Sequence, residues 1–119
     1  MGLLATGKHF PGHGDTEIDS HHALPTITFS KARLDSIEMY PYKKLFAEGL
    51  ASVMVAHLNV PSLEPRENIP SSVSHNIITD VLKNQLGFKG LIFTDALNMK
   101  AAKNFREPGD IDLEAFQAG

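Results

Sequence analysis

The sequence contains no cysteine, and this absence excludes two kinds of site. Without cysteine there is neither a disulfide framework nor a thiolate metal site, and the redox compartment cannot be inferred. No apolar run reaches the roughly 18–20 residues that a membrane-spanning helix needs. The N-terminus also lacks a basic segment followed by a long apolar core, so we expect no signal peptide in this chain.

An excess of basic residues is missing as well. The 119 residues carry 11 Lys and Arg against 14 Asp and Glu, which gives a formal net charge of −3. Nucleic acids and anionic membranes favour clustered positive charge, so neither is expected as the main partner. With 42% apolar and 21% charged residues, the composition is typical of one globular domain.

Apolar runs of strand length alternate with helical patterns along the chain. Three strands are predicted, at residues 3–8, 51–57 and 90–96. Helices are predicted to begin at Lys31, after the capping residue Ser30, and at Pro41, and to cover residues 74–86 and 109–119.

Repeated strand–helix units imply a parallel sheet with helical crossovers. Three strands are too few for a complete (β/α)8 barrel, which usually takes about 250 residues. We therefore predict an α/β fold in which residues 1–119 form about three βα units from the C-terminal part of a (β/α)8 TIM barrel, truncated at both ends. A self-contained small α/β domain is the alternative.

Polar and chemically reactive side chains follow each predicted strand, at residues 9–22, 57–59 and 95–98. In parallel α/β folds the carboxyl ends of the strands carry the functional site. We therefore expect these three segments to meet at one edge of the sheet.

The first of these segments, KHFPGHGDTEIDSHH, holds four histidines and three acidic residues. Imidazole and carboxylate groups can bind zinc or iron, but no HExxH motif is present, and a Pro–Gly turn separates His9 from His13. The segment also matches neither of the common glycine-rich phosphate-binding motifs. A metal centre and a phosphate-binding loop are both disfavoured, and no cofactor is expected.

An acid–base site explains the segment better. Asp19 and His21 are separated by one residue, so both side chains can project to the same side of an extended segment. A carboxylate beside an imidazole holds the ring in one tautomer and raises its pKa, which makes the histidine a useful proton donor. Asp95 ends a buried strand and could act as a base or a nucleophile. The alternatives stay open: Asp95 could cap a short helix, and Asp19 and His21 could stabilise a loop.

Three blocks of the sequence resemble one enzyme family. KHFPGHGDTEIDSH followed by LP, then VMVAHLNVPSL, then LGFKGLIFTDALNMKA are similar to blocks of glycoside hydrolase family 3, in its branch of β-N-acetylglucosaminidases. The resemblance covers nearly the whole chain, and the first block is the most specific because other branches lack this histidine-containing loop. Details such as AHLNVPSL and TDALNMK are similar to versions from Bacteroidetes-like bacteria.

The resemblance implies a retaining glycosidase mechanism on three residues. Asp95 matches the nucleophile that forms a covalent glycosyl-enzyme, His21 matches the general acid/base, and Asp19 matches its dyad partner. A neutral imidazole does not repel an anionic acceptor as a carboxylate would, so phosphate could replace water in the second step.

The resemblance also implies the substrate, a glycan or muropeptide with terminal β-linked N-acetylglucosamine. Lys8 and His9 match a pair that binds sugar hydroxyls, and His57 matches a histidine near the pocket. Further sugar-binding residues of the family lie on strands that precede this region, so the chain alone is expected to be inactive. The expected compartment is the bacterial cytoplasm or periplasm. A family 3 β-glucosidase-type hydrolase, a non-catalytic sugar-binding fragment and a metal-dependent hydrolase are the competing hypotheses.

Overall fold

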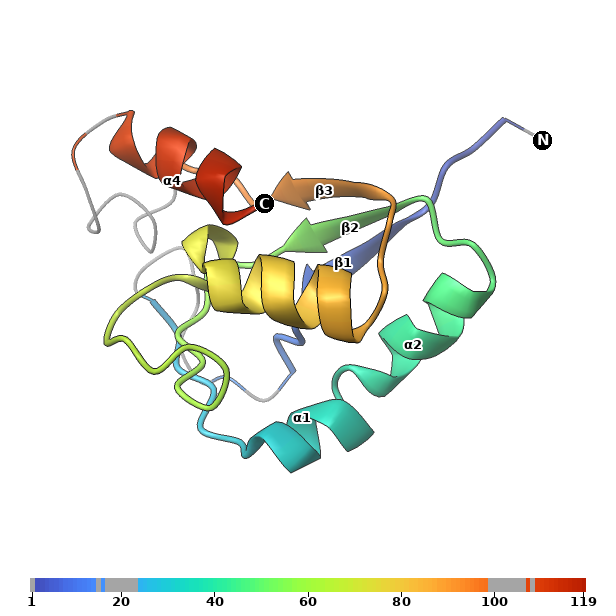
Figure 1. Cartoon of the computed structure of the whole chain (residues 1–119), viewed down its shortest axis with the longest axis horizontal. Coiled ribbons are helices and arrows are strands. Elements are labelled where there is room, and N and C mark those ends of the chain that lie inside the picture. The colour runs from blue at the N-terminus through green and yellow to red at the C-terminus, as the bar shows by residue number, and fades with distance from the viewer. Residues whose placement is uncertain (1, 15, 17–23, 99–106, 108) are drawn as a thin grey trace.

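The computed structural model describes residues 2–14, 16, 24–98, 107 and 109–119, and it places three strands in one sheet (Figure 1). The strands are β1 (Thr6–Phe10), β2 (Ser52–Val55) and β3 (Leu91–Thr94), in the spatial order β1-β2-β3. Both neighbouring pairs are parallel, which confirms the predicted α/β class with a parallel sheet. Strands β2 and β3 are shorter than predicted, because the chain leaves the sheet before His57 and Asp95.

Five helical segments lie within the described residues. They are α1 (Lys31–Ser36), α2 (Tyr40–Ala47), η1 (Ser71–Val73), η2 (Asn76–Gln85) and α4 (Asp110–Ala118). Ser30 caps α1 as predicted, because its side-chain oxygen accepts a hydrogen bond from the Arg33 amide. Pro41 lies in the first turn of α2, where its missing amide hydrogen costs no helical hydrogen bond. None of these helices has both the length and the apolar character needed to cross a membrane.

One face of the sheet packs against α2 and η2 and forms the hydrophobic core. Val53 and Val55 of β2 are completely buried on this face. Aromatic rings extend the core toward α2, since Phe10 meets Tyr42 edge-on with ring centroids 5.2 Å apart. The remaining buried members of this core are Ile27, Leu34, Met39, Ala56, Leu58, Val60, Leu63, Ile77, Val81, Leu82 and Phe88.

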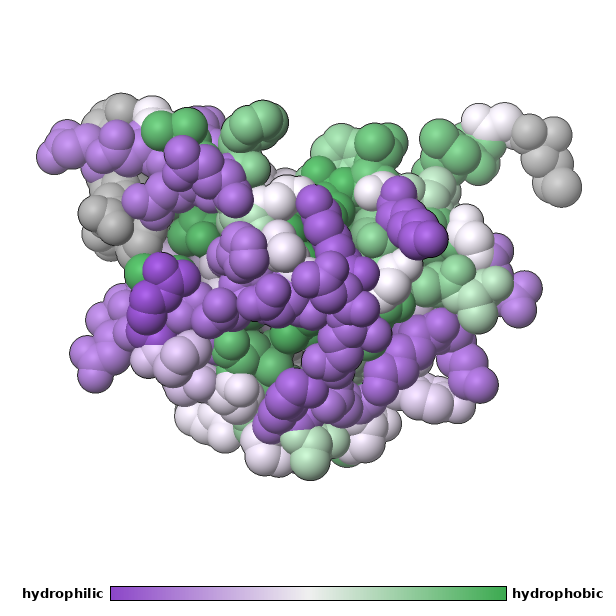
Figure 2. All heavy atoms as spheres, viewed as in Figure 1, coloured by the Kyte–Doolittle hydropathy of each residue, from purple (hydrophilic) through white to green (hydrophobic). Residues whose placement is uncertain are grey.

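The opposite face of the sheet is open in the part of the chain that the structure describes. The strand register places Lys8, Met54 and Phe93 side by side on this face. Phe93 is 49% exposed, and Leu91, which lies on the same face of β3, is 60% exposed. Hydrophobic residues, coloured green, accordingly stand out along the upper edge of Figure 2. The sheet therefore has one packed face and one exposed apolar face.

A buried carboxylate holds the long connection after β2. The side chain of Glu64 is fully buried and accepts hydrogen bonds from the Arg66 guanidinium at 2.8 and 2.9 Å and from the Ser74 hydroxyl at 2.6 Å. The hydrogen bonds from Arg66 are the main reason that the pKa of Glu64 falls from 4.5 to about 2, although burial opposes the change. Ser74 also accepts from the Ile77 amide, so this network joins the connection to the beginning of η2.

We predict that Glu64→Gln lowers the free energy of unfolding by roughly 3 kcal/mol at pH 7, in the protein expressed from the complete reading frame that contains this chain. A carboxylate whose pKa falls on folding stabilises the fold above its unfolded value of 4.5, and this contribution is lost as the pH falls through about 2. The difference between wild type and variant, measured by denaturant unfolding, should therefore be less than about half as large at pH 3 as at pH 7.

Asp80→Asn is the matched control for this measurement. Asp80 is 56% exposed where it pairs with His75, so its loss should change stability by less than about 0.5 kcal/mol. An equal effect of Glu64→Gln at both pH values would show that the ionised carboxylate is not the stabilising group.

Candidate active site

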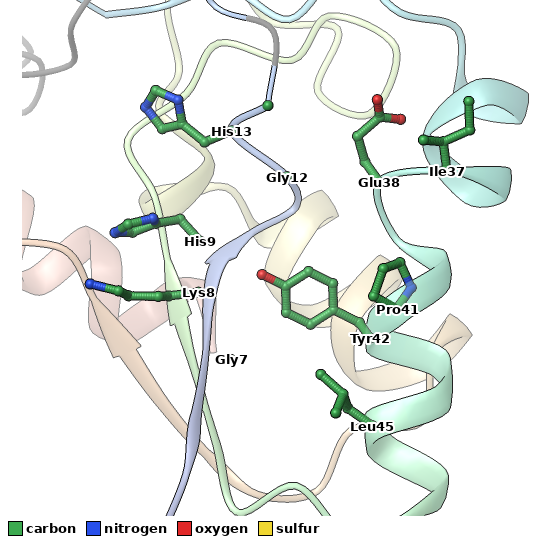
Figure 3. Close-up of a pocket in the computed structure, with 11 residues that line it drawn as sticks. Gly7, Lys8, His9, Gly12, His13, Ile37, Glu38, Pro41, Tyr42 and Leu45 are labelled. Atoms are coloured by element: carbon green, nitrogen blue, oxygen red, sulfur yellow. The ribbon is translucent and has the colours of Figure 1, made fainter.

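The end of β1 is irregular, and the irregularity brings two basic side chains to one side of the sheet. Lys8 pairs with Met54 and Phe10 pairs with Val55, so the register shifts at His9. Neighbouring side chains of a regular strand point to opposite faces, whereas Lys8 and His9 both point away from α2 (Figure 3). The same shift returns Phe10 to the core, where it is fully buried.

Asp95 follows β3 and lies beside this pair. Its amide donates to the Val55 carbonyl at 2.9 Å, and its carboxylate oxygen Oδ1 accepts from the Ala96 amide at 2.9 Å. The other oxygen, Oδ2, lies 3.7 Å from Nε2 of His9, which is close but longer than a hydrogen bond. The two side chains are 27% and 31% exposed, so ligand atoms can reach them. The predicted meeting of the ends of β1 and β3 is thus observed.

The surroundings of His9 favour its neutral form. Burial is the main reason that the pKa of His9 lies below its ordinary 6.5, and the positive charges of Lys8 and His13 add to this effect. The Asp95 carboxylate opposes it. A neutral imidazole has one donor and one acceptor nitrogen, which suits hydrogen bonding to a hydroxyl group.

His57 lies at the same edge, immediately after β2, but it is buried. The residue is 1% exposed, and both ring nitrogens have protein partners. Nδ1 lies 2.6 Å from the Ser72 hydroxyl, and Nε2 lies 3.1 Å from the carbonyl oxygen of Ala96. Burial is the main cause that lowers the pKa of His57, which Asp95 and the Ala96 carbonyl oppose. The contact between His57 and substrate stays a prediction, and the structure adds that its ring already bonds to the protein.

His13 lies in the loop that follows β1 and contacts another residue of that loop. Its Nδ1 lies 3.0 Å from the Thr16 hydroxyl, and its ring meets that of His9 edge-on at 6.1 Å. A cavity of about 480 Å³ separates this loop from Tyr42 of α2 (Figure 3). Lys8 and His9 are among the residues that line this cavity, but their side chains point away from α2, and His9 meets Asp95 on that other side.

The predicted acid–base pair, Asp19 and His21, lies outside the described residues, so its geometry and roles stay predictions. Among the residues that are described, no three His, Cys, Asp or Glu side chains gather closely enough to hold a metal ion. The described residues do bring a carboxylate, an ammonium group and an imidazole to one edge of the sheet. The ammonium and imidazole groups can bind hydroxyls, and the carboxylate can attack an electrophilic carbon.

The whole chain, residues 1–119, matches the family model described as the glycosyl hydrolase family 3 N terminal domain. This chain belongs to glycosyl hydrolase family 3. The resemblance that its three sequence blocks carried is thereby confirmed.

Relatives of this family 3 chain are longer proteins. Beta-hexosaminidase A of Pseudoalteromonas piscicida is 34% identical over 128 residues, which cover 99% of this chain and 21% of the relative. A family 3 beta-N-acetylglucosaminidase from Paenibacillus sp. str. FPU-7 superimposes with a TM-score of 0.94 at 44% identity, over 98% of this chain and 22% of that one. NagZ from Neisseria gonorrhoeae, in complex with N-trifluoroacetyl-D-glucosamine, superimposes with a TM-score of 0.84 at 34% identity, over 99% and 32%. The chain thus spans 21% to 33% of the length of the first curated relatives that it matches.

Two groups of this family 3 site were missed by sequence reasoning. The Ala96 carbonyl is a backbone group, and nothing in the sequence indicates that a side chain holds it. Ser72 lies between the predicted strand at 51–57 and the predicted helix at 74–86, in a connection that carries several prolines. The sequence pattern that could have indicated Ser72 is the stretch SSVS at 71–74, which directly precedes the apolar pattern of η2. The structure buries all three of its serines completely.

We predict that Gly12→Ala destabilises the loop that carries His13, by about 1–3 kcal/mol. Gly12 has a φ of +134°, and a Cβ at this position would lie 2.6 Å from the Cβ of Glu38. Gly14→Ala is the matched control in the same loop, because a Cβ there meets no atom within 4 Å. Thermal unfolding of both variants tests the prediction, and equal losses would contradict it.

Proposed function

We propose that this chain supplies the nucleophile and the acid/base residues of a retaining β-N-acetylhexosaminidase that releases terminal β-linked N-acetylglucosamine. The observation that carries the proposal is the position of Asp95, whose Oδ2 lies 3.7 Å from His9 at the carboxyl end of the sheet. The superposition with a family 3 beta-N-acetylglucosaminidase, at a TM-score of 0.94, supports the same reaction.

The first step forms a covalent glycosyl-enzyme. Oδ1 of Asp95 is bonded to the Ala96 amide, so Oδ2 is the oxygen that attacks the anomeric carbon. Protonated His21, oriented by Asp19, gives its proton to the glycosidic oxygen as the bond to the leaving group breaks.

The second step releases the sugar. His21 takes a proton from water, whose oxygen attacks the anomeric carbon from the face that the leaving group left, and the bond to Asp95 breaks. The anomeric configuration is therefore retained.

The substrate is held by Lys8 and His9, whose side chains lie side by side on one side of β1 (Figure 3). An ammonium group donates hydrogen bonds, and a neutral imidazole can donate and accept them, so the pair suits sugar hydroxyls. The complex of NagZ with N-trifluoroacetyl-D-glucosamine supports an N-acylated glucosamine as the bound sugar. The substrate class is then a glycan or peptidoglycan-derived muropeptide, met in the bacterial cytoplasm or periplasm.

The chain contributes about three βα units to a larger (β/α)8 barrel in this proposal. Parallel sheets are normally covered on both faces, but Leu91 and Phe93 are 60% and 49% exposed on the face opposite the core. This chain spans only 21% to 33% of the first curated relatives. Their further residues are enough to cover that face and to complete the sugar pocket.

We predict that Asp95→Asn abolishes turnover and keeps sugar binding, in the protein expressed from its complete reading frame. Asparagine keeps the size of the side chain but loses the nucleophilic charge, so kcat/KM for a chromogenic N-acetylglucosaminide should fall at least about 1,000-fold. Binding of N-acetylglucosamine, measured by calorimetry, should change by less than about 3-fold. Asp80→Asn is the control that should leave both values unchanged, and full activity of Asp95→Asn would overturn the proposal.

A substrate panel on the wild type separates the competing functions. Faster turnover of a β-glucoside would indicate a β-glucosidase-type hydrolase, and sugar binding without turnover of any glycoside would indicate a binding module. Inactivation by a chelator would indicate a metal-dependent hydrolase. Formation of a sugar 1-phosphate in phosphate buffer would indicate phosphorolysis instead of hydrolysis.

We further predict that the isolated 119-residue chain has less than about 1% of the kcat/KM of the complete protein, because only part of the sugar pocket is present. Its exposed sheet face and the outer edges of β1 and β3, which pair with no further strand among the described residues, should also make it self-associate. Activity assays combined with size-exclusion chromatography test both statements, and turnover by a monomeric chain at the rate of the complete protein would contradict them.

A further inference from the structure

The end of β2 contacts the turn after β3 at two points, and these points lie on either side of the Asp95 side chain. The Val55 carbonyl accepts from the Asp95 amide at 2.9 Å. Two residues later, Nε2 of His57 lies 3.1 Å from the carbonyl oxygen of Ala96. One short segment, residues 55–57, therefore fixes the backbone both before and after the carboxylate.

The partners of His57 determine which of its ring nitrogens carries the proton. A carbonyl oxygen can only accept, so Nε2 donates to Ala96. In the neutral ring Nδ1 is then an acceptor, and the Ser72 hydroxyl, 2.6 Å away, donates to it. The Ser72 hydroxyl therefore donates to His57, and His57 donates to the Ala96 carbonyl.

Helix η1 holds this arrangement in place. The Ser71 hydroxyl donates to the Ala56 carbonyl at 2.6 Å and accepts from the Leu58 amide at 3.1 Å, so it fixes the backbone on both sides of His57. Ser71 and Ser72 are completely buried, and His57 is 1% exposed. A ring that is enclosed and bonded at both nitrogens has one orientation, which a group that positions another residue requires.

We infer that His57 is a positioning residue for Asp95, oriented by Ser72, and that it acts through the Ala96 backbone rather than by contact with the sugar. The inference rests on the proposed glycosidase function. Ala96 connects the two side chains, since its carbonyl is held by His57 and its amide holds Oδ1 of Asp95. Loss of the His57 bond frees this turn, and a displacement of about 1 Å at the reacting oxygen can cost about 100-fold in rate.

Two amide substitutions at position 57 test this inference in the protein expressed from its complete reading frame. Glutamine can place an N–H near the position of Nε2 and donate to the Ala96 carbonyl, whereas asparagine is one methylene shorter and cannot reach it. For an activated aryl N-acetylglucosaminide, His57→Asn should lower kcat about 10- to 100-fold and change KM by less than about 3-fold. His57→Gln should recover most of the loss in kcat.

A pair of serine substitutions provides a second test that does not alter His57. Ser72→Ala removes the donor to Nδ1 and should lower kcat about 3- to 10-fold, because the ring loses its orientation. Ser74→Ala removes an equally buried hydroxyl that contacts Glu64 and Ile77 instead, so it should lower the melting temperature and leave kcat unchanged. This pair decides the question if His57→Asn does not fold.

The results separate the inference from its alternatives. A raised KM with unchanged kcat in His57→Asn would identify a sugar contact and overturn the inference. A lower melting temperature with unchanged kcat in both His57→Asn and Ser72→Ala would overturn it in favour of a purely structural role. If the wild type hydrolyses no glycoside, the proposed function fails first and the inference fails with it.

Discussion

The end of β2 holds the ends of both outer strands, and the spacing of the reactive groups depends on it. The Ala56 amide donates to the Phe10 carbonyl at 2.9 Å, which fixes the end of β1, while the Val55 carbonyl accepts from Asp95 at 2.9 Å beyond β3. Val53 and Val55 are completely buried, so this central strand cannot shift without disturbing the core. The 3.7 Å separation of His9 and Asp95 is therefore set by packing on the far side of the sheet.

The two faces of the sheet contribute differently to the site. The packed face is apolar and carries the aromatic contact between Phe10 and Tyr42, which joins β1 to α2. The open face and the strand ends carry the partly exposed groups, among them Lys8, His9 and Asp95. Since α/β proteins place their sites at the carboxyl ends of parallel strands, the groups at this edge are separate from the apolar contacts that hold the core.

The sequence predicted the parts of this arrangement that depend on local pattern. The apolar run through Val53 and Val55 indicated a buried parallel strand, and Ser30 marked the beginning of α1. The common orientation of Lys8 and His9 could not be predicted, because it depends on the register that β1 adopts against β2. The bond from His57 to Ala96 joins residues 39 positions apart and ends on a backbone carbonyl, which leaves no pattern in the sequence.

The shifted register at His9 also limits how β1 can change in evolution or by design. Before His9 the strand alternates regularly, and Gly7 faces Tyr42 of α2. After His9, Phe10 faces the core, although regular alternation from Lys8 would turn it to the open face. Removing one residue here would restore an even strand, in which two neighbouring basic side chains can no longer lie on the same side. An insertion or deletion in this strand therefore disturbs both the core and the site, whereas a point substitution disturbs only one of them.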